Sequence, residues 1–389
     1  MKILVYDMGS YTYHDLIFYL KKLGHSCHTI YYHFPDKFHD EFFTHHFSGH
    51  LRENHYDCVF SINFFPLIAQ LCDQFHIKYL SWCYDSPMEE NLEKYFHYET
   101  NHIFIFDEIE ALQYNRRGHQ NVYHMPLAVN TARLDRLTFS KSQISAYQTD
   151  ISFVGRLYQH SPLNALLYSA DDYTKGYIEG IFQTQLRIYG SYLLDDLIPD
   201  DLLEHLNAGF RTLDRNAVPL TRRGLSYAIA SQITYRERTF LLEQLGESFH
   251  TKLYSTDAYP FPPGSLVENC GPAKYYSEMP GIFRYSKLNL CPTLKCIQSG
   301  IPLRALDIMG SKGVLFSNYQ PELAELFQDG EDCIMYESME DACDKASFYL
   351  AHDDLRRQIA RNGYNKVAEG FRYEQRLTQI FSRVYGVAP

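Results

Sequence analysis

Short apolar runs alternate with longer amphipathic stretches along the chain, and this alternation predicts parallel strands joined by helices. The first run, residues 2–7, is continuous and apolar, ends at Asp7, and is followed by a glycine loop and an amphipathic stretch over 13–23. A strand, a loop and a helix in this order open an α/β domain. Further strands are expected at 26–32, 56–62, 77–83 and 102–108, with spacings that can hold crossover helices.

A polar segment over 131–149 interrupts this pattern, and a new apolar strand follows at 150–155. Residues 161–245 are mostly helical in character, after which strands are expected at 250–255, 286–291, 313–318 and 332–337. The sequence therefore predicts two Rossmann-like, doubly wound α/β domains with a cleft between them and a helical insertion in the second. The expected divisions are 1–149, 150–370 and a C-terminal helical segment over 371–389.

Composition excludes several classes of protein. The 47 acidic residues outnumber the 36 basic ones and give a net charge of −11, which argues against general affinity for nucleic acid or anionic membranes. No apolar run reaches membrane-spanning length and the N-terminus lacks the pattern of a signal peptide, so no transmembrane segment and a cytoplasmic location are expected. Nine cysteines without a C-x-x-C pair suit a reducing compartment. Nothing in the sequence indicates the oligomeric state.

The segment SGIPLRALDIMGSKG, residues 299–313, joins glycines, a proline and charged side chains. Proline is favourable as the first helical residue, so a helix is predicted to begin at Pro302, and the N–H groups before it would attract an anion. An arginine suits phosphate, and a carboxylate three residues later, on the same face, suits ribose hydroxyls. The candidate nucleotide-binding residues of this segment are Ser299, Gly300, Ile301, Pro302, Arg304 and Asp307.

The same segment also fits a capped helix in which Arg304 and Asp307 pair with each other, and the local pattern favours the two interpretations equally.

Two other loops offer similar chemistry. Gly155 and Arg156 follow a predicted strand and would present a guanidinium to a diphosphate, although a surface arginine after a turn explains them alone. Lys274 follows a strand-end glycine and would lie near phosphate, although a plain turn explains that loop equally well.

Acid–base candidates lie in the first domain. Asp85, in SWCYDSPMEE, follows a predicted strand and would deprotonate or orient an acceptor hydroxyl. Capping of the turn or helix that Pro87 begins is at least as good an explanation. His14, Asp7 and Asp15 are rival bases at the end of the first strand and the start of its helix; His14 and Asp7 rank below Asp85.

The motifs of several enzyme classes are absent from the sequence, among them G-x-x-x-x-G-K-[ST], G-x-G-x-x-G, H-E-x-x-H, G-x-S-x-G and D-x-D. Their absence weakens the P-loop, dinucleotide, zinc-protease and serine-hydrolase interpretations. His46 and His50 have the spacing of a helical metal pair, but a solvated helix face is the simpler explanation. No metal site is predicted.

Residues 286–336 resemble the C-terminal half of GT-B glycosyltransferases, most closely the CgeB-like (spore maturation protein) group with its S-G-I-P-x-R-x-x-D segment. DISFVGRLY and SWCYDSP are also similar to that group. Related enzymes carry a Glu-x7-Glu motif that corresponds here to Ser299 and Asp307. The resemblance implies that Asp307 binds the donor's ribose, that Ser299 replaces a carboxylate that contacts the sugar, and that Arg156 binds phosphate.

The resemblance implies a first domain that binds the acceptor, a second that binds the donor, and a final helix that crosses back to the first. It implies metal-independent transfer of a sugar from a nucleoside diphosphate sugar, with UDP as the expected nucleotide, to a hydroxyl of a glycan or protein, without a cofactor. Two alternatives remain open: a nucleotide-sugar epimerase or phosphorylase of the same architecture, and a non-catalytic protein that binds a sugar or nucleotide.

Overall fold

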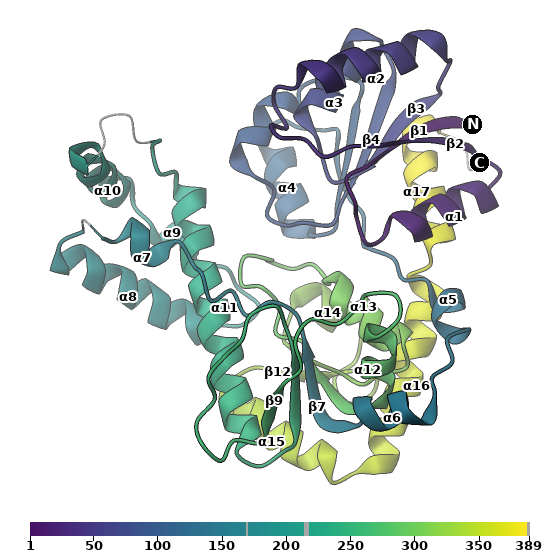
Figure 1. Cartoon of the computed structure of the whole chain (residues 1–389). Coiled ribbons are helices and arrows are strands. Elements are labelled where there is room, and N and C mark those ends of the chain that lie inside the picture. The colour runs from purple at the N-terminus through teal and green to yellow at the C-terminus, as the bar shows by residue number, and fades with distance from the viewer. Residues whose placement is uncertain (169, 214–217, 387–389) are drawn as a thin grey trace. The chain divides into compact units, whose positions relative to one another are not determined.

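The computed structural model of the chain describes residues 1–168, 170–213 and 218–386, which form two compact units (Figure 1). The first unit contains residues 1–132, the short segment 300–306 and the chain from residue 367 onward. The second contains residues 133–299 and 307–366. Each unit is built around one six-stranded parallel sheet with flanking helices, which confirms the predicted pair of doubly wound α/β folds.

The sheet of the first unit has the strand order β2-β1-β3-β4-β5-β6. Its strands are β1 Lys2–Asp7, β2 Ser26–Tyr31, β3 Cys58–Ile62, β4 Lys78–Cys83, β5 Asn101–Ile105 and β6 Val122–His124. Its helices are α1 Tyr13–Lys22, α2 Glu41–Glu53, α3 Pro66–Gln74, η1 Glu90–Tyr95, α4 Glu108–Arg116 and α17 Tyr373–Tyr385, and α5 Thr131–Asp135 spans its end. Five strands were predicted; β6 was missed because three residues are too few to show a period.

The sheet of the second unit has the order β12-β11-β10-β7-β8-β9. Its strands are β7 Thr149–Val154, β8 Thr251–Tyr254, β9 Val267–Asn269, β10 Ser286–Leu290, β11 Leu315–Asn318 and β12 Ile334–Tyr336. The helices packed with it are α6 Lys141–Tyr147, α12 Met279–Tyr285, α13 Leu303–Gly310, α14 Pro321–Leu326, α15 Met339–Leu350 and α16 Asp353–Gly370. The three-residue edge strand β9 was not predicted, because its residues are partly exposed and polar.

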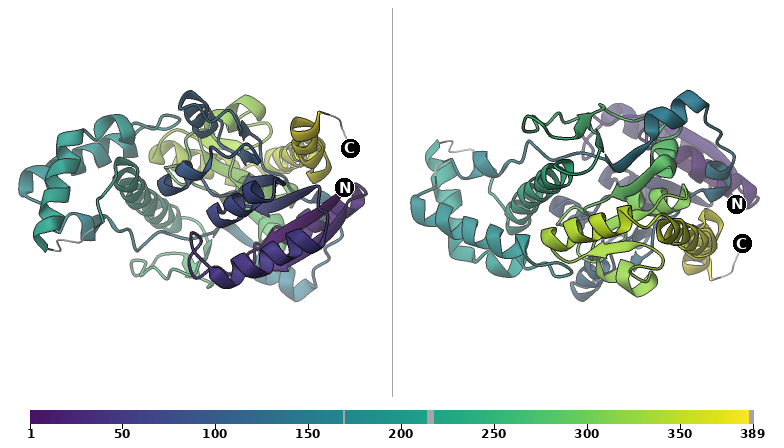
Figure 2. Two further views of the ribbon diagram at one scale, coloured as in Figure 1. Left: turned by 90° about the horizontal axis from the view of Figure 1, so that it is seen from above. Right: turned by 90° about the horizontal axis from the view of Figure 1, so that it is seen from below.

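A helical insertion separates β7 from β8, as predicted. It consists of α7 Leu163–Leu166, α8 Asp172–Leu186, α9 Leu194–Leu197, α10 Asp200–Leu213 and α11 Arg222–Gly246. The first four helices stand to one side of the second sheet in every view, and α11 runs from them to the sheet (Figures 1 and 2). A separate apolar core that includes Ile181, Phe182 and Ile229 holds the insertion together.

Residues 133–147 group with the second unit, so the first unit ends earlier in this division than the expected residue 149. The guanidinium of Arg284 in α12 donates to the carbonyls of Leu134, at 2.8 Å, and Leu137, at 3.2 Å. Lys312 also pairs with Asp135 at 2.7 Å. These bonds fasten the polar segment that precedes β7 to the second unit.

The C-terminal helix α17 packs within the first unit (Figure 1). Tyr373 stacks on Tyr19 of α1 with ring centroids 5.2 Å apart, and Lys78 donates to the carbonyl of Val384 at 2.9 Å. Phe381 is 1% exposed and packs against His25 at 4.7 Å. Residues 387–389, the end of the segment expected to be helical, lie outside the described residues.

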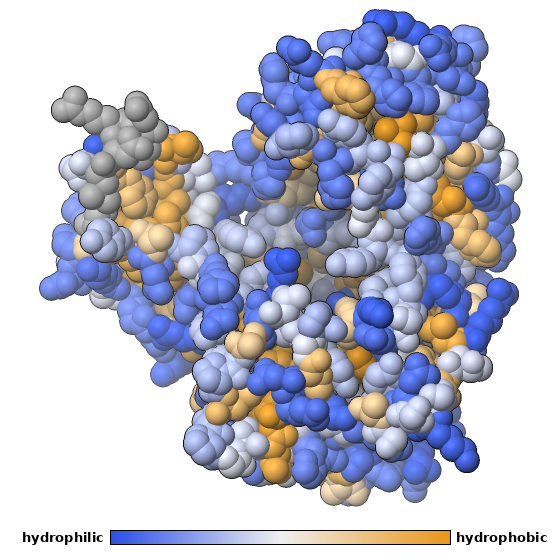
Figure 3. Space-filling model, in the orientation of Figure 1, coloured by the Kyte–Doolittle hydropathy of each residue, from blue (hydrophilic) through white to orange (hydrophobic). Residues whose placement is uncertain are grey.

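Hydrophilic residues cover most of the face seen in Figure 3, and a group of apolar side chains lies over the insertion helices. Within the described parts of the chain, no helix combines the length and apolar character needed to cross a bilayer.

Replacement of Phe381 by alanine tests the anchoring of α17. The substitution leaves a cavity in a buried site, so the free energy of unfolding should fall by about 3–5 kcal/mol in urea titrations. Phe348→Ala is the matched control because Phe348 is 49% exposed, and it should change little. Equal effects of the two substitutions would show that α17 is not held by burial.

Candidate functional site

The candidate site of the second unit lies where its strand order reverses. The strands β7 and β10 are neighbours in the middle of the sheet. The strands β8 and β9 follow toward the edge next to β7, and β11 and β12 follow toward the opposite edge, next to β10. Ligands of open parallel sheets bind beyond the carboxyl ends of the strands at such a reversal. The loops that follow β7 and β10 are therefore the place to look, and they contain Gly155, Arg156 and Ser299.

A buried arginine of α11 joins these two loops. The guanidinium of Arg238 donates to the carbonyl of Arg156 after β7, and to the carbonyl of Pro292 after β10 at 2.6 Å. Arg238 is 9% exposed, and burial lowers its pKa. The sequence analysis missed this residue. The available signal was the run of three charged residues at 236–238 in the interior of a long helical stretch.

Glu237 of the same helix is fully buried and forms a second link. One of its carboxylate oxygens, Oε1, accepts a hydrogen bond from the Tyr189 hydroxyl at 2.8 Å and lies 3.3 Å from Nζ of Lys295. The side-chain oxygen of Thr234, one turn earlier, accepts the N–H of Lys295 at 3.0 Å. Three side chains of α11 therefore position the loop that follows β10.

Ser299, expected at the head of the anion-binding segment, is 2% exposed. Its hydroxyl donates to Oε1 of Glu322 at 2.7 Å, and the N–H of Glu322 donates back to the Ser299 carbonyl at 3.2 Å. Glu322 belongs to α14, which follows β11, and is 4% exposed. A buried carboxylate thus lies beside Ser299, and no local pattern predicts it because it comes from another loop.

The helix α13 begins at Leu303 rather than at the predicted Pro302, since Pro302 takes the position before the first helical residue and its carbonyl accepts the N–H of Ala305. Asp307 is 7% exposed and accepts a hydrogen bond from the Tyr275 hydroxyl at 3.0 Å. Residues 300–306, which include Gly300, Ile301, Pro302 and Arg304, group with the first unit, and Ser299 and Asp307 with the second.

The remaining candidates of the second unit lie in strand-end loops. The N–H of Gly155 donates to the carbonyl of Tyr254 at 3.0 Å, which extends the pairing of β7 with β8. The side chain of Arg156 is exposed although its carbonyl is held by Arg238. Lys274 is also exposed, and its backbone N–H donates to the Glu278 carboxylate at 2.8 Å in a turn that leads into α12.

Asp85, in the first unit, follows β4, and its carboxylate accepts a hydrogen bond from the Asn63 amide at 2.6 Å. The side-chain oxygen of Asn63 accepts the N–H of Tyr84 at 2.8 Å, so one residue after β3 holds the Asp85 loop. Desolvation raises the pKa of the Asp85 carboxyl and the Asn63 bond opposes that rise. Asp85 is an exposed residue, so its desolvation is partial.

The rival acid–base candidates of the first unit differ in burial. His14 is exposed in the first turn of α1, where its ring lies 5.6 Å from that of Tyr13. Asp7 closes a turn, because its carboxylate accepts the N–H groups of Gly9 and Ser10. Asp15 is buried and accepts a hydrogen bond from Asn130 at 2.6 Å. Among all described residues, no cluster of three or more His, Cys, Asp or Glu side chains is arranged to hold a metal ion.

The link made by Arg238 can be tested by replacing it with methionine. Two loop carbonyls then lose charge-assisted hydrogen bonds of about 1.5–3 kcal/mol each, so the free energy of unfolding should fall by about 3 kcal/mol or more. The control is Arg236→Met on the same helix, because that side chain is 48% exposed, forms a 3.6 Å surface pair with Glu179 and bonds to no loop carbonyl in the described contacts; its guanidinium also lies 4.3 Å from the centroid of the Phe182 ring. Equal losses in both variants would contradict the assigned role of Arg238.

A comparison with protein families gives one match: residues 236–382 match the family described as glycosyl transferase-like. The matched segment begins at the charged trio of α11 and includes both loops that follow β10 and β11. No curated protein matches the chain.

Solved structures similar to this chain cover nearly all of it. They include a glycosyltransferase from Rickettsia africae, with a TM-score of 0.56, 9% identity and 99% of both chains covered. Anabaena HepE in complex with UDP and glucose gives a TM-score of 0.53 at 10% identity, and T4 phage BGT with its UDP-glucose substrate gives 0.53 at 8% identity; both comparisons cover 100% of each chain. At such low identity these likenesses establish the fold. The chain therefore has the GT-B glycosyltransferase fold, and its C-terminal part, residues 236–382, matches a glycosyl transferase-like family.

Proposed function

We propose that the protein is a metal-independent glycosyltransferase that moves a sugar from a nucleoside diphosphate sugar, with UDP as the nucleotide, to a hydroxyl of a glycan or protein. The observation that carries this proposal is the pair of loops after β7 and β10, which Arg238 joins at the strand-order reversal. Arg238 and the loop after β10 lie inside the matched family segment. The structural neighbours that hold UDP or UDP-glucose support the choice of donor. The S-G-I-P-x-R-x-x-D segment further favours the CgeB-like group.

The donor side of the mechanism is electrostatic. Arg156 and Arg304 neutralise the charge that grows on the leaving diphosphate, and the backbone N–H groups of residues 299–303 before α13 assist them. Lys274 adds a further positive charge, and Asp307 binds the ribose hydroxyls. Because these groups supply positive charge without a metal ion, the reaction needs no cofactor.

Ser299 and Glu322 act together in this proposal. Glu322 accepts a hydrogen bond from the Ser299 hydroxyl at 2.7 Å, so its carboxylate lies beside the segment that binds the donor. A carboxylate that reaches the site from α14 takes the place of the one that Ser299 replaces.

Asp85 is the proposed base that removes the proton from the acceptor hydroxyl, with His14 as the second choice. A carboxylate whose pKa is raised is a stronger base near neutral pH. Asp85 has this property, and its exposed position admits an acceptor.

Donor binding is tested by calorimetry with UDP and with UDP-sugars. Arg156→Ala and Arg304→Ala should each weaken binding of UDP roughly tenfold or more, as loss of a charged hydrogen bond implies. Arg357→Ala, a side chain 73% exposed on α16, is the control and should bind as wild type. Unchanged affinity in both test variants, or no binding of UDP or GDP to the wild-type protein, would overturn the donor assignment.

Turnover distinguishes the alternatives. NMR spectra of a mixture of the protein and a nucleotide sugar, without an acceptor, test for an epimerase. Conversion of the donor's sugar into its epimer in this mixture would identify one. Tight binding of the donor without release of nucleotide, even with a library of acceptors, identifies a non-catalytic binding protein.

The role of Asp85 predicts the pH dependence of kcat/KM. The base acts as a carboxylate, so activity should fall as the pH drops through a pKa above the ordinary value of 3.8. Asn63→Ala removes a hydrogen bond that favours the carboxylate, so it should raise this pKa further and move the acid limb to higher pH. Asp85→Asn should lower kcat roughly 100-fold or more. An unmoved acid limb in Asn63→Ala, with near-normal turnover by Asp85→Asn, would exclude Asp85 as the base.

A further inference from the structure

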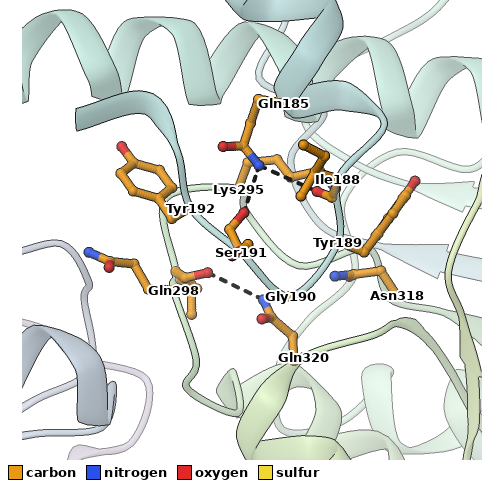
Figure 4. Close-up of a pocket in the computed structure, with 11 residues that line it drawn as sticks. Gln185, Ile188, Tyr189, Gly190, Ser191, Tyr192, Lys295, Gln298, Asn318 and Gln320 are labelled. Atoms are coloured by element: carbon orange, nitrogen blue, oxygen red, sulfur yellow. Dashed lines mark hydrogen bonds between the residues drawn. The ribbon is translucent and has the colours of Figure 1, made fainter. Parts of the chain in front are cut away.

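A polar hollow between the segment 188–192 and the loops after β10 and β11 lies beside the candidate donor site (Figure 4). The Gln185 amide holds one wall by donating to the carbonyl of Ser191 at 2.8 Å. A feature unrelated to that site lies in the first unit, at one edge of its sheet.

The strand β2 forms this edge (Figure 1). All six of its residues are in register with β1, from Ser26 opposite Lys2 to Tyr31 opposite Asp7. The other edge strands of the two sheets in the described chain, β6, β9 and β12, have three residues each. β2 therefore presents the longest row of edge backbone groups for pairing with a further strand.

The outward backbone groups of β2 follow from its pairing with β1. The N–H of Tyr32, directly after the strand, donates to the carbonyl of Asp7 at 3.1 Å. Alternate residues bond to the same neighbour in a parallel pair, so Cys27, Thr29 and Tyr31 direct their N–H and carbonyl groups away from β1. None of these three N–H groups donates to another described residue.

This edge lacks the features that protect most edge strands. Lysine, proline and bulges commonly prevent such strands from pairing. The strand SCHTIY contains no lysine, arginine, carboxylate or proline, and its register has no bulge. His28 contacts the Tyr56 hydroxyl at 2.9 Å, and Thr29 contacts the Tyr13 hydroxyl. Because side chains of a strand point to the two faces of the sheet, these contacts leave the edge itself accessible.

A second copy of β2 fits this edge. Antiparallel pairing about a two-fold axis at Thr29 places that residue opposite itself, with Cys27 of one copy opposite Tyr31 of the other. No like charges oppose each other within the paired strands, because β2 has no lysine, arginine or carboxylate. Two-fold dimers are the commonest symmetric assemblies of soluble proteins.

The start of β2 has basic surroundings. Lys2 is opposite Ser26 in the adjacent strand. Lys21 of α1 is exposed and lies near Cys27: burial raises the pKa of the Cys27 thiol, and the ammonium of Lys21 opposes that rise. The Asp57 carboxylate, which accepts the N–H of Lys2 at 2.6 Å, offsets one of these positive charges.

The end of β2 has acidic surroundings. Asp7 is opposite its last residue, and the Asp40 carboxylate accepts a hydrogen bond from the Tyr32 hydroxyl at 2.8 Å. Lys37 follows in the same loop, but its ammonium is paired with Glu89 at 2.5 Å. Antiparallel pairing brings the basic start of one copy beside the acidic end of the other. This charge complementarity favours a second copy of the chain in that orientation.

Exposed aromatic side chains border the end of the strand. Tyr31 is 64% exposed. Phe42 is 68% exposed, and its ring centroid lies 6.0 Å from that of Tyr32. Aromatic residues are enriched in protein interfaces, so their position here also suits a protein partner.

We propose that β2 is the interface of a homodimer, in which the two six-stranded sheets of the first units join edge to edge into one continuous sheet. The assembly does not depend on the proposed transferase function, because the paired residues 26–31 include none of the candidate donor or acid–base residues.

Sedimentation velocity of the full chain tests this proposal. Wild-type protein should shift from monomer toward dimer between roughly 1 and 100 μM, the range that reports dimers of moderate affinity. Thr29→Lys should raise the dissociation constant of the dimer roughly tenfold or more, because two ammonium groups then face each other at the axis. Thr256→Lys, at an exposed threonine of the second unit, adds the same charge and is the matched control.

A charge swap tests the self-pairing of Thr29. Thr29→Glu alone should weaken the dimer as Thr29→Lys does, and an equimolar mixture of the two variants should associate again, because unlike charges then face each other. Circular dichroism spectra that match those of Thr256→Lys show that the variants remain folded.

Hydrogen exchange provides a test on the wild-type protein alone. The amides of residues 26–31 should exchange more slowly at concentrations where the dimer forms, and those of the β6 edge, residues 122–124, should not change.

The outcomes separate this proposal from the proposed function. A wild-type monomer at every concentration, or a dimer that both Thr29 variants leave intact, overturns the β2 interface. A mixture of the two variants that stays monomeric overturns the antiparallel arrangement about Thr29. Calorimetry with UDP is read independently: a monomer that binds UDP contradicts the dimer alone, and a dimer that does not bind UDP contradicts the proposed function alone.

Discussion

The geometry of the candidate donor site depends on the buried charged side chains of α11. Arg238 donates to carbonyls of two different strand-end loops, and Glu237 holds Lys295 and Tyr189. A buried charge costs free energy unless it is paired. Displacement of either loop would leave the charge of Arg238 or Glu237 without its partner, so these pairings keep the loops in place. Side chains of α11 therefore hold the loops after β7 and β10 in place within the protein itself.

This arrangement holds an exposed positive side chain and a buried serine–carboxylate pair in fixed loops of one unit. The fixed carbonyl of Arg156 leaves that side chain exposed at the end of β7. The fixed loop after β10 brings the Ser299 hydroxyl to the Glu322 carboxylate, at 2.7 Å. Preorganised groups of this kind stabilise charge that develops during a reaction without paying for reorganisation at that moment. The insertion, which contributes α11, thus positions the strand-end loops of the second unit.

The sequence alone predicted the alternation of strands and helices, because the apolar runs of parallel strands are long and continuous. It missed β6 and β9, which are three residues each, and it placed the start of α13 one residue early at Pro302. The division of the chain also differs from the expectation at 149, because the bonds of Arg284 to Leu134 and Leu137 are not visible in a local pattern.

Local pattern singles out Arg156 and Ser299 because each stands next to a glycine in a loop that follows a strand, and their roles stay predictions. Glu237, Arg238 and Glu322 lie in helices, and their partners are far away in sequence, so no local spacing reveals them. The hydrogen bond from Asn63 to Asp85 is of the same kind, since it joins residues that follow two different strands. Glu237, Arg238 and Glu322 are unusual because they are charged and buried, and only the folded chain shows that burial.

A thermal-shift screen of nucleotides and nucleotide sugars tests the central claim most directly, because a ligand that binds only the folded state raises its stability by mass action. UDP and at least one UDP-sugar should raise the midpoint of unfolding in a concentration-dependent manner without any added metal ion, and NAD should not. A midpoint that no nucleoside diphosphate or nucleotide sugar moves, at concentrations up to the millimolar range typical of weak ligands, would contradict the assignment of a nucleotide-sugar site to this chain.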